Sequence, residues 1–304
     1  MRKIDGGTFT MGSDAHYPEE GPSRRVSVDA FLIDEAPVTN REFAAFVEAT
    51  NHVTACEIPP RPEDYPGLLP EMAHAGSLVF QKPRAPRRLR EGEWWDMVFG
   101  AAWNRPLGPG SGIEDLLDHP VVHVTYADAK AYATWAGKRL PTEAEWEFAA
   151  RGGLEGKEFA WGDELSPGGR MLANFWQGEF PYQNTLLDGW ERTSPVRSFP
   201  ANGYGLFDMI GNVWEWTEDW FVSARTGAAR SPCCGADRRG AATEADSIDP
   251  NEAVFAIGRK VLKGGSHLCA ENYCRRYRPA ARWPQPIDTS TSHSGFRCAK
   301  SLDT

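Results

Sequence analysis

The sequence predicts an α+β fold, a single compact domain (residues 1–304) with low regular secondary structure. The first 36 residues alternate apolar and polar side chains as strands do, and three later segments carry the periodicity and caps of helices. From residue 154 to residue 304, short strand-like runs alternate with Gly, Pro and Asn turns, and almost nothing has a helical pattern. No fixed-period repeat and no linker-like change in composition divides the 304 residues, so we expect one domain.

The N-terminal strands lie in "GGTFTMGS" and "RRVSVDAFLIDEAPV", which glycines and a proline punctuate. The next segment, "VTNREFAAFVEAT", predicts a helix because Phe43, Phe46 and Val47 have the three-and-four spacing of a buried stripe. Thr39 or Asn40 is the expected N-cap of this helix.

Two contrasting segments follow. Residues 57–92 carry prolines and basic residues without periodicity, so they predict a long irregular surface excursion of the kind that is often functional. "HPVVHVTYADAKAYATWAGKRLPTEAEWEFAARGG" is far more regular and predicts a short strand at 121–125 and a helix at 126–136. A second helix begins at Thr142, which with Glu145 has the spacing of a capping box.

Composition excludes several classes of function. A net charge of −9 disfavours general nucleic-acid binding, and the local arginine run at 275–282 is interpreted as a solvated or ion-paired face. No apolar stretch approaches the roughly 18–20 residues that a membrane span requires. The N-terminus has no apolar signal-peptide region, so we expect a cytoplasmic protein with reduced thiols. The cysteines are too few and too scattered for a disulfide scaffold. They are Cys56, Cys233, Cys234, Cys269, Cys274 and Cys298.

Two of these cysteines, Cys269 and Cys274, lie five positions apart in "GGSHLCAENYCRRYRPAAR". On a helix this spacing would point the thiols about 140° apart, so both can reach one ion only from a turn or loop. The pair could form a disulfide, grip a metal, act as a redox pair or simply pack. Zinc is disfavoured because structural sites use four ligands and Cys233-Cys234 are adjacent, whereas two soft thiolates suit Cu(I).

The blocks around these cysteines resemble the formylglycine-generating enzymes, also called sulfatase-modifying factors, of prokaryotic type. The resemblance runs through "GTFTMGS", "VTNREFAAFV", "ANFWQGEFP", "NGYGLFDMIGNVWEWTEDWF", "VLKGGSH" and "TSHSGFRC", and it is weakest at 55–100 and 222–255. It implies a C-type lectin-like fold and a copper-dependent oxidase. That oxidase converts the cysteine of a Cys-x-Pro-x-Arg motif in unfolded sulfatases to Cα-formylglycine with O₂.

The resemblance also implies the residues of the site. Cys269 and Cys274 match the cysteines that bind Cu(I) in the family, which leaves room for the substrate thiolate. Ser266 matches the active-site serine, and Tyr273 is a plausible donor in the same pocket. His267 could be a ligand, but we interpret it as a structural imidazole.

Two structural Ca²⁺ sites are implied as well, in oxygen-rich stretches whose residues alone are equally consistent with ordinary turns. The first would use the side chains of Asn174 and Asp188 with the carbonyls of Phe175 and Trp190. The second would use the side chains of Asp208 and Glu215 with the carbonyls of Gly211 and Val213.

The sequence also departs from the family. Ala133, Ala149 and Pro279 occupy positions that carry disulfide cysteines in eukaryotic members, which leaves Cys298 without its family partner. His293 stands where the human-type sequence has asparagine, and its role stays open.

Two rival functions and one recognition question remain. A non-catalytic lectin-like binding paralogue is the main alternative, and an iron-dependent sulfoxide synthase is disfavoured because it needs an additional helical domain supplying histidines.

We expect walls from the tryptophan-rich C-terminal half to receive the substrate proline. Asp115, Asp118 and Glu57 are candidates for the carboxylate that receives its arginine.

Overall fold

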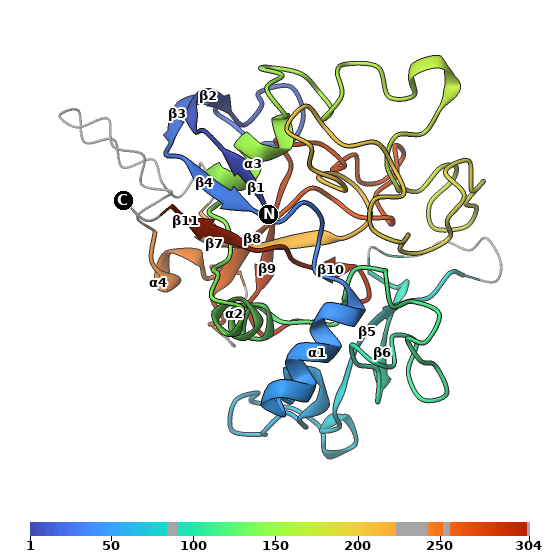
Figure 1. Cartoon of the computed structure of the whole chain (residues 1–304). Helices are drawn as coiled ribbons and strands as arrows, with labels where there is room; N and C mark the ends of the chain where they lie inside the picture. Colours follow the sequence, from blue (N-terminus) through green and yellow to red (C-terminus); the bar gives the residue numbers. More distant parts are fainter. Residues whose placement is uncertain (84–89, 91, 223–241, 252–255, 303–304) are drawn as a thin grey trace.

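A computed structural model describes residues 1–304 except 84–89, 91, 223–241, 252–255 and 303–304 (Figure 1). The described residues contain eleven short strands and four helices, with irregular chain between them. The strands are β1 (Arg2–Ile4), β2 (Gly7–Met11), β3 (Arg24–Val28), β4 (Phe31–Ile33), β5 (Gly76–Phe80), β6 (Trp95–Phe99), β7 (Trp214–Trp220), β8 (Arg259–Lys263), β9 (Arg282–Pro286), β10 (Ser294–Gly295) and β11 (Ala299–Ser301). The helices are α1 (Asn40–Thr50), α2 (Tyr126–Trp135), α3 (Glu143–Arg151) and α4 (Glu244–Ser247).

Four small sheets organise the described chain. The largest has the order β10-β7-β8-β9, in which β7, β8 and β9 are antiparallel and β10 runs parallel to β7. In a second sheet β4 pairs with both β1 and β11, so strands from the two ends of the chain share one sheet (Figure 1). The β2-β3 and β5-β6 pairs are separate hairpins. These sheets, with much irregular chain, confirm the predicted α+β class.

The three predicted helices are confirmed, and local sequence signals explain where they begin. Thr39 caps α1 and Thr142 caps α3, each in a capping box with an acidic residue three positions later. Gly152 ends α3 at a φ of 55°, in the left-handed conformation that glycine adopts readily. Ring contacts between Phe43 of α1 and Tyr132 of α2 hold the two helices together, as their neighbouring ribbons in Figure 1 show.

The predicted strand at 121–125 is wrong. His123 has a φ of 60°, which no extended strand contains, and the segment bonds to distant chain instead of a ladder. The backbone N–H of Val121 donates to the carbonyl of Val38, and that of His123 donates to the carbonyl of Thr291. Residues 121–125 therefore form a buried segment that hydrogen-bonds to both the N-terminal and the C-terminal part of the chain. Its burial explains why the run is apolar.

The reading of 57–92 as wholly irregular is also wrong in part. Its residues 76–80 form β5, which pairs along its full length with β6. The hydroxyl of Ser77 also bonds to Ser290, more than two hundred positions away. The strand depends on these distant partners, so the local pattern did not reveal it. Residues 84–89 and 91 of this segment lie outside the described residues.

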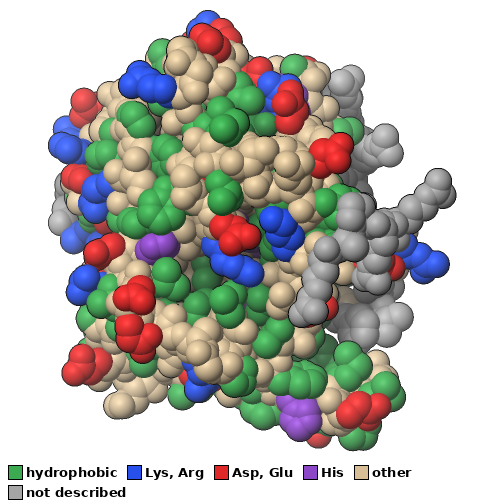
Figure 2. All heavy atoms as spheres, turned by 90° about the vertical axis from the view of Figure 1, so that its right-hand side faces the viewer, with side chains coloured by type: hydrophobic (Ala, Val, Ile, Leu, Met, Phe, Trp, Pro, Cys, Tyr) green, Lys and Arg blue, Asp and Glu red, His purple; other side chains and the backbone are tan. Residues whose placement is uncertain are grey.

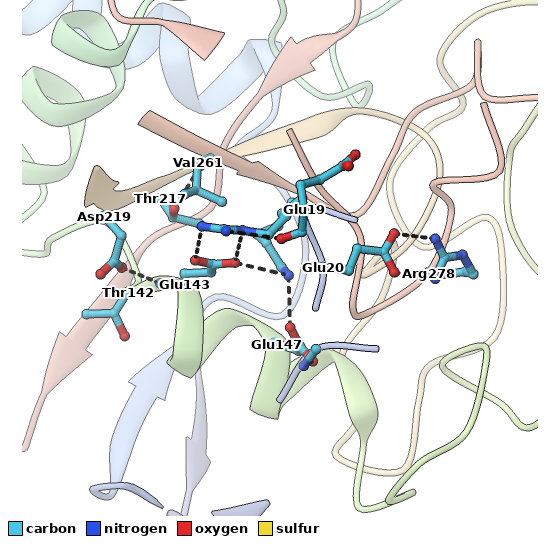
Figure 3. A network of polar contacts seen from close by, with 12 residues as sticks. Glu19, Glu20, Thr142, Glu143, Glu147, Thr217, Asp219, Val261 and Arg278 are labelled. Carbon is cyan, nitrogen blue, oxygen red and sulfur yellow. Dashed lines mark hydrogen bonds and ion pairs between the residues drawn. The ribbon is translucent and has the colours of Figure 1, made fainter. Parts of the chain in front are cut away.

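The arginine run at 275–282 is ion-paired, as one of its two interpretations held, but much of it is buried. Arg276 pairs with Glu19 at 2.6 Å and Arg282 with Glu143 at 2.8 Å, and Arg278 pairs with Glu20. Figure 3 shows Glu143 and Glu147 projecting from α3 and Glu20 facing Arg278. Because each buried guanidinium has a carboxylate, this network fixes the chain that carries Cys269 and Cys274.

Among the described helices, none is long and apolar enough to cross a membrane.

Candidate functional site

A cavity of about 200 Å³, here called the thiol pocket, brings the two cysteines together. Its walls come from the β5-β6 hairpin, from the segments 266–276 and 283–293, and from Phe180 and Trp214. Figure 2 looks onto the side of the molecule that carries β5 and β6 and shows hydrophobic side chains around a hollow near the middle of this face.

The chain reaches the pocket through a glycine pair that ends β8. Gly264 and Gly265 have φ values of 90° and 72°, and a Cβ on Gly265 would lie 2.6 Å from the carbonyl oxygen of Arg276. Only glycine allows this close return of the chain. The next residues form tight turns in which the N–H of Cys274 donates to the carbonyl of Ala270 at 2.8 Å.

As a result, the Sγ atoms of Cys269 and Cys274 lie 3.3 Å apart. This confirms the turn that the spacing predicted. A disulfide bond is about 2 Å long, so both cysteines are thiols here. Cys56 and Cys298 are buried free thiols as well, while Cys233 and Cys234 lie outside the described residues.

The two thiols differ in their protonation. The pKa of Cys274 is lowered to about 7, chiefly because the Cys269 thiol donates to its sulfur, and Nη1 of Arg276 adds a contact at 3.5 Å. Burial raises the pKa of Cys269, and the charge of Cys274 raises it further. Near neutral pH the pair therefore shares one proton between two sulfurs and offers a ready thiolate ligand or nucleophile.

Ser266 and His293 meet at the edge of the same pocket. Burial, with the nearby His267 and His123, lowers the pKa of His293 well below its ordinary value, so its ring is neutral. Its Nδ1 lies 3.1 Å from Oγ of Ser266, whose oxygen also accepts from the backbone N–H of Leu268. The structure thus places His293, whose role the sequence left open, beside the predicted serine.

His267 lies elsewhere, although it is adjacent to Ser266 in sequence. Its Nδ1 donates to the carbonyl of Asn212 at 2.9 Å, and burial lowers its pKa to about 4. It is absent from the described lining of the thiol pocket. This geometry fits a structural imidazole.

Aromatic rings form the outer wall of the pocket. Tyr273 stacks on Phe180 with a centroid distance of 4.5 Å and meets the edge of Trp94 at 5.1 Å. Trp94 and Trp95 line the pocket, although both precede the C-terminal half from which we expected the walls. The C-terminal half does supply most of the described lining, including Trp214 and Trp283, so that expectation is corrected only by adding the β5-β6 hairpin to the wall. The adjacent tryptophans in "EGEWWD" were the available signal.

None of the three expected carboxylates lines the thiol pocket. Asp118 pairs with Arg41 on the surface, and Glu57 accepts from Thr54 at the cap of a one-turn helix. A neighbouring cavity of about 340 Å³ shares Leu78 and Thr289 with the thiol pocket.

Asp288 lines this neighbouring cavity and is the one acidic side chain among the described residues lining either cavity. Its carboxylate accepts from the Tyr65 hydroxyl at 2.6 Å. Sequence reasoning missed Asp288, because only the fold brings it to a cavity that adjoins the thiol pocket.

The first expected calcium set contains one side-chain oxygen that has no hydrogen-bond donor among the described residues. Oδ1 of Asn174 is fully buried and has no hydrogen-bond partner, whereas its amide nitrogen donates to the carbonyl of Arg192. Burial raises the pKa of Asp188, whose carboxylate accepts from the N–H groups of Phe175 and Trp190. A cation would satisfy Oδ1 of Asn174, whereas the Asp188 carboxylate already accepts from these two N–H groups.

The second expected set is different, because a cation already faces part of it. Glu215 accepts from Arg297 at 2.7 Å through both carboxylate oxygens and from the Trp146 indole at 2.8 Å. Burial raises the pKa of Asp208 to about 6. A calcium ion here would have to share the Glu215 carboxylate with a guanidinium. No group of three or more His, Cys, Asp or Glu side chains converges as a metal site within the described ranges.

Comparisons with known proteins agree with this architecture. The model of the sulfatase-modifying factor enzyme 1-like domain matches residues 1–302. A formylglycine-generating enzyme of Mycobacterium tuberculosis is 51% identical over 297 residues, which cover 97% of this chain and 95% of the relative. An inactive Cα-formylglycine-generating enzyme 2 of Bos taurus is 43% identical over 311 residues, 98% of this chain and 87% of the relative.

Among solved structures, PvdO from Pseudomonas aeruginosa superposes with a TM-score of 0.62 at 26% identity and covers 99% of this chain and 93% of its own. The relatives include both enzymes and a protein named as inactive, so sequence similarity does not distinguish a catalytic from a non-catalytic function. The geometry of the thiol pocket is the evidence that bears on this choice.

Proposed function

Because the chain belongs to the sulfatase-modifying factor enzyme 1-like family, we propose that it oxidises a cysteine of sulfatase polypeptides to Cα-formylglycine. The observation that carries this proposal is the pair of sulfurs 3.3 Å apart in a pocket lined by aromatic rings. A lectin-like binding paralogue would have no need for two reduced thiols that share a proton beneath such a pocket.

Cys269 and Cys274 would hold Cu(I). Both donors are soft, one is a thiolate near neutral pH, and neither is committed to a disulfide, so the donor set suits this ion. When bound, copper would supply the one-electron chemistry that lets O₂ react with the substrate cysteine.

The residues of the chain do the rest. Arg276 lines the thiol pocket, pairs with Glu19 and contacts Sγ of Cys274, so it helps to keep Cys274 as a thiolate. Ser266, held by its contacts with His293 and with the backbone N–H of Leu268, presents its hydroxyl oxygen to the reacting sulfur or to a water. Tyr273 and Trp94 screen the site from bulk solvent.

The electron balance requires one more reactant. Two electrons and two protons leave the C–S unit of the substrate cysteine to give a thioaldehyde, which water hydrolyses to the aldehyde and hydrogen sulfide. O₂ accepts four electrons when it becomes water, so a thiol reductant must supply the other two.

The proposed substrate is an extended, unfolded segment with the motif Cys-x-Pro-x-Arg. The aromatic wall of Phe180 and Trp94 offers a surface for the proline. Asp288, in the adjoining cavity, offers a carboxylate within reach of a neighbouring arginine. Both features support recognition of a peptide that runs across the two cavities.

Two further parts of the proposal concern ions and location. Ca²⁺ at Asn174 and Asp188, and at Asp208 and Glu215, would stabilise the irregular loops. The free thiols of the described cysteines support a reducing, cytoplasmic environment.

Incubation with O₂, a thiol reductant, Cu(I) and a Cys-x-Pro-x-Arg peptide tests the proposed function. Mass spectrometry should show the peptide losing sulfur and gaining an aldehyde that an aminooxy reagent captures. If the peptide binds but no conversion occurs with any metal, the binding-paralogue alternative holds.

A further inference from the structure

A second cavity, of about 120 Å³, lies behind the thiol pocket and is called here the rear cavity. The segment 291–293 separates the two: Ser292 lines the rear cavity, whereas Thr291 and His293 line the thiol pocket. Trp103, Leu116 and Val122 are among the apolar residues of its wall. The volume exceeds what a single water needs and suits a ligand of several non-hydrogen atoms.

Arg192 is the one charged residue among the described residues that line the rear cavity. Among the described residues, its guanidinium makes one hydrogen bond, a long one of 3.4 Å from Nη2 to the carbonyl of Phe80. Within the described ranges no carboxylate lies within 4.0 Å of its guanidinium, because the adjacent Glu191 faces Lys82. Burial accordingly lowers the pKa of Arg192.

This situation contrasts with the rest of the interior. The buried guanidinium groups of Arg278, Arg282 and Arg297 each contact a carboxylate. Arg192 is only half-buried, but it stands in a cavity wall that holds no counter-charge among the described residues, so its guanidinium is available to pair with an anion from outside the chain.

A second group in the same cavity also lacks a partner. Asn40 is 3% exposed, its amide nitrogen donates to the carbonyl of Leu116 at 2.8 Å, and its Oδ1 is enclosed without any donor. Buried polar atoms are nearly always satisfied, by protein, water or ligand. Among the described residues, the rear cavity therefore offers a positive charge at Arg192 and a buried acceptor without a donor at Asn40.

We propose that the rear cavity binds a small organic hydroxycarboxylate. The planar guanidinium of Arg192 would receive the carboxylate, and the ligand hydroxyl would donate to Oδ1 of Asn40. The apolar walls disfavour a strongly hydrated divalent anion and accommodate a short carbon chain. This site is independent of cysteine oxidation, so it stands or falls separately from the proposed function.

Titration calorimetry and thermal melts with sodium lactate test the site, at constant ionic strength set with sodium chloride. Lactate should bind the wild-type protein and raise its melting temperature, and propionate, which lacks the hydroxyl, should raise it less. Arg192→Met should abolish both responses. The control Arg61→Met removes an exposed arginine paired with Asp64 and should respond as the wild type does.

The Arg192→Met variant carries a second readout. Because it removes a partly desolvated charge that has no carboxylate within 4.0 Å among the described residues, it should melt at or above the temperature of the wild type in lactate-free buffer. If that variant fails to fold, Arg192→Lys keeps a point charge without the planar fork, and its lactate response should be weaker than that of the wild type.

Four outcomes would overturn the proposal or its hydroxyl contact. Equal stabilisation by chloride alone would reduce the effect to ionic strength. A response to sulfate but not to lactate would exclude a carboxylate ligand. An undiminished lactate response in Arg192→Met would remove Arg192 from the site, and equal responses to lactate and propionate would remove the Asn40 contact.

Discussion

The hydroxyl of Ser266 faces Nδ1 of His293 across 3.1 Å, and both side chains line the thiol pocket. In the neutral tautomer that carries its proton on Nε2, Nδ1 accepts from the Ser266 hydroxyl and holds the serine proton away from the reacting sulfur. His293 is therefore a positioning residue whose effect passes through Ser266.

Substitution of His293 tests this relationship. His293→Leu removes the acceptor, and we expect kcat to fall roughly five- to tenfold because one hydrogen bond contributes about 1 kcal/mol. His293→Asn places an amide oxygen near the same position and should restore most of the loss. Steady-state kinetics with the motif peptide checks both variants. Equal losses in the two would indicate a packing role instead.

A charge exchange tests substrate recognition. Asp288→Asn should raise KM for the arginine-containing peptide roughly tenfold or more, because a charge-assisted hydrogen bond contributes about 1.5–3 kcal/mol. It should leave KM unchanged for a peptide with glutamine in place of arginine. Asp118→Asn is the matched control, since that carboxylate pairs with Arg41 away from both cavities. If Asp288→Asn treats the two peptides as the wild type does, another group reads the arginine.

How far the site could be predicted depends on the range of its contacts. Thr39 and Thr142 start helices through hydrogen bonds to residues three positions away, so their sequence patterns were sufficient. The turn that carries the thiol pair was also predictable from local sequence. An α-helix cannot bring together two sulfurs that are five residues apart, so their meeting requires a turn or loop.

The remaining site residues were inaccessible for the opposite reason. Trp95 reaches the pocket only through pairing of β5 with β6, and Asp288 only because β9 returns the chain to this side. His123 shows the same limit: its apolar neighbours suggested a strand, but distant hydrogen bonds hold it at a positive φ. Such contacts span up to two hundred positions and leave no local pattern.

Metal removal tests the calcium proposal. A chelator should lower the melting temperature, because a ligand bound only to the folded state stabilises it by roughly 2.7 kcal/mol at a hundredfold excess over Kd. Asp188→Ala should reproduce part of this loss and blunt the chelator response. Reductant should leave the melt unchanged, since the described cysteines are free thiols.

Glu215→Ala is a poor reporter in that experiment. It would leave the buried Arg297 without its carboxylate and so destabilise the protein with or without calcium. A chelator-insensitive melt of the wild-type protein, together with a sharp loss on adding reductant, would contradict the calcium proposal.

The pH dependence of stability should report Asp208. Burial raises its folded-state pKa from 3.8 to about 6, so the folded protein holds this proton more tightly than the unfolded chain. The resulting stabilisation is complete below pH 3.8 and is lost as the pH rises through 6. In chelator, Asp208→Asn should therefore be more stable than the wild type at pH 7, by about 3 kcal/mol at one pKa unit per 1.4 kcal/mol.

Urea denaturation between pH 4 and pH 7 checks this expectation. Burial also raises the pKa of Asp219 to about 6, so Asp219 contributes in the same pH range. Asp208→Asn should therefore weaken the pH dependence of the free energy of unfolding without abolishing it. If the free energy of unfolding of the variant and of the wild type changed equally with pH, Asp208 would already be charged in the folded protein.

The central claim is that Cys269 and Cys274 together form the copper site at which a peptidyl cysteine is oxidised. The most direct measurement titrates Cu(I) into metal-free protein while following formylglycine formation by mass spectrometry, with Cys269→Ser and Cys274→Ser in parallel. We predict that turnover by the wild type rises linearly to one equivalent of Cu(I) and then stays constant, and that neither variant turns over at any copper level. Full turnover without copper, or by either variant, would contradict the account.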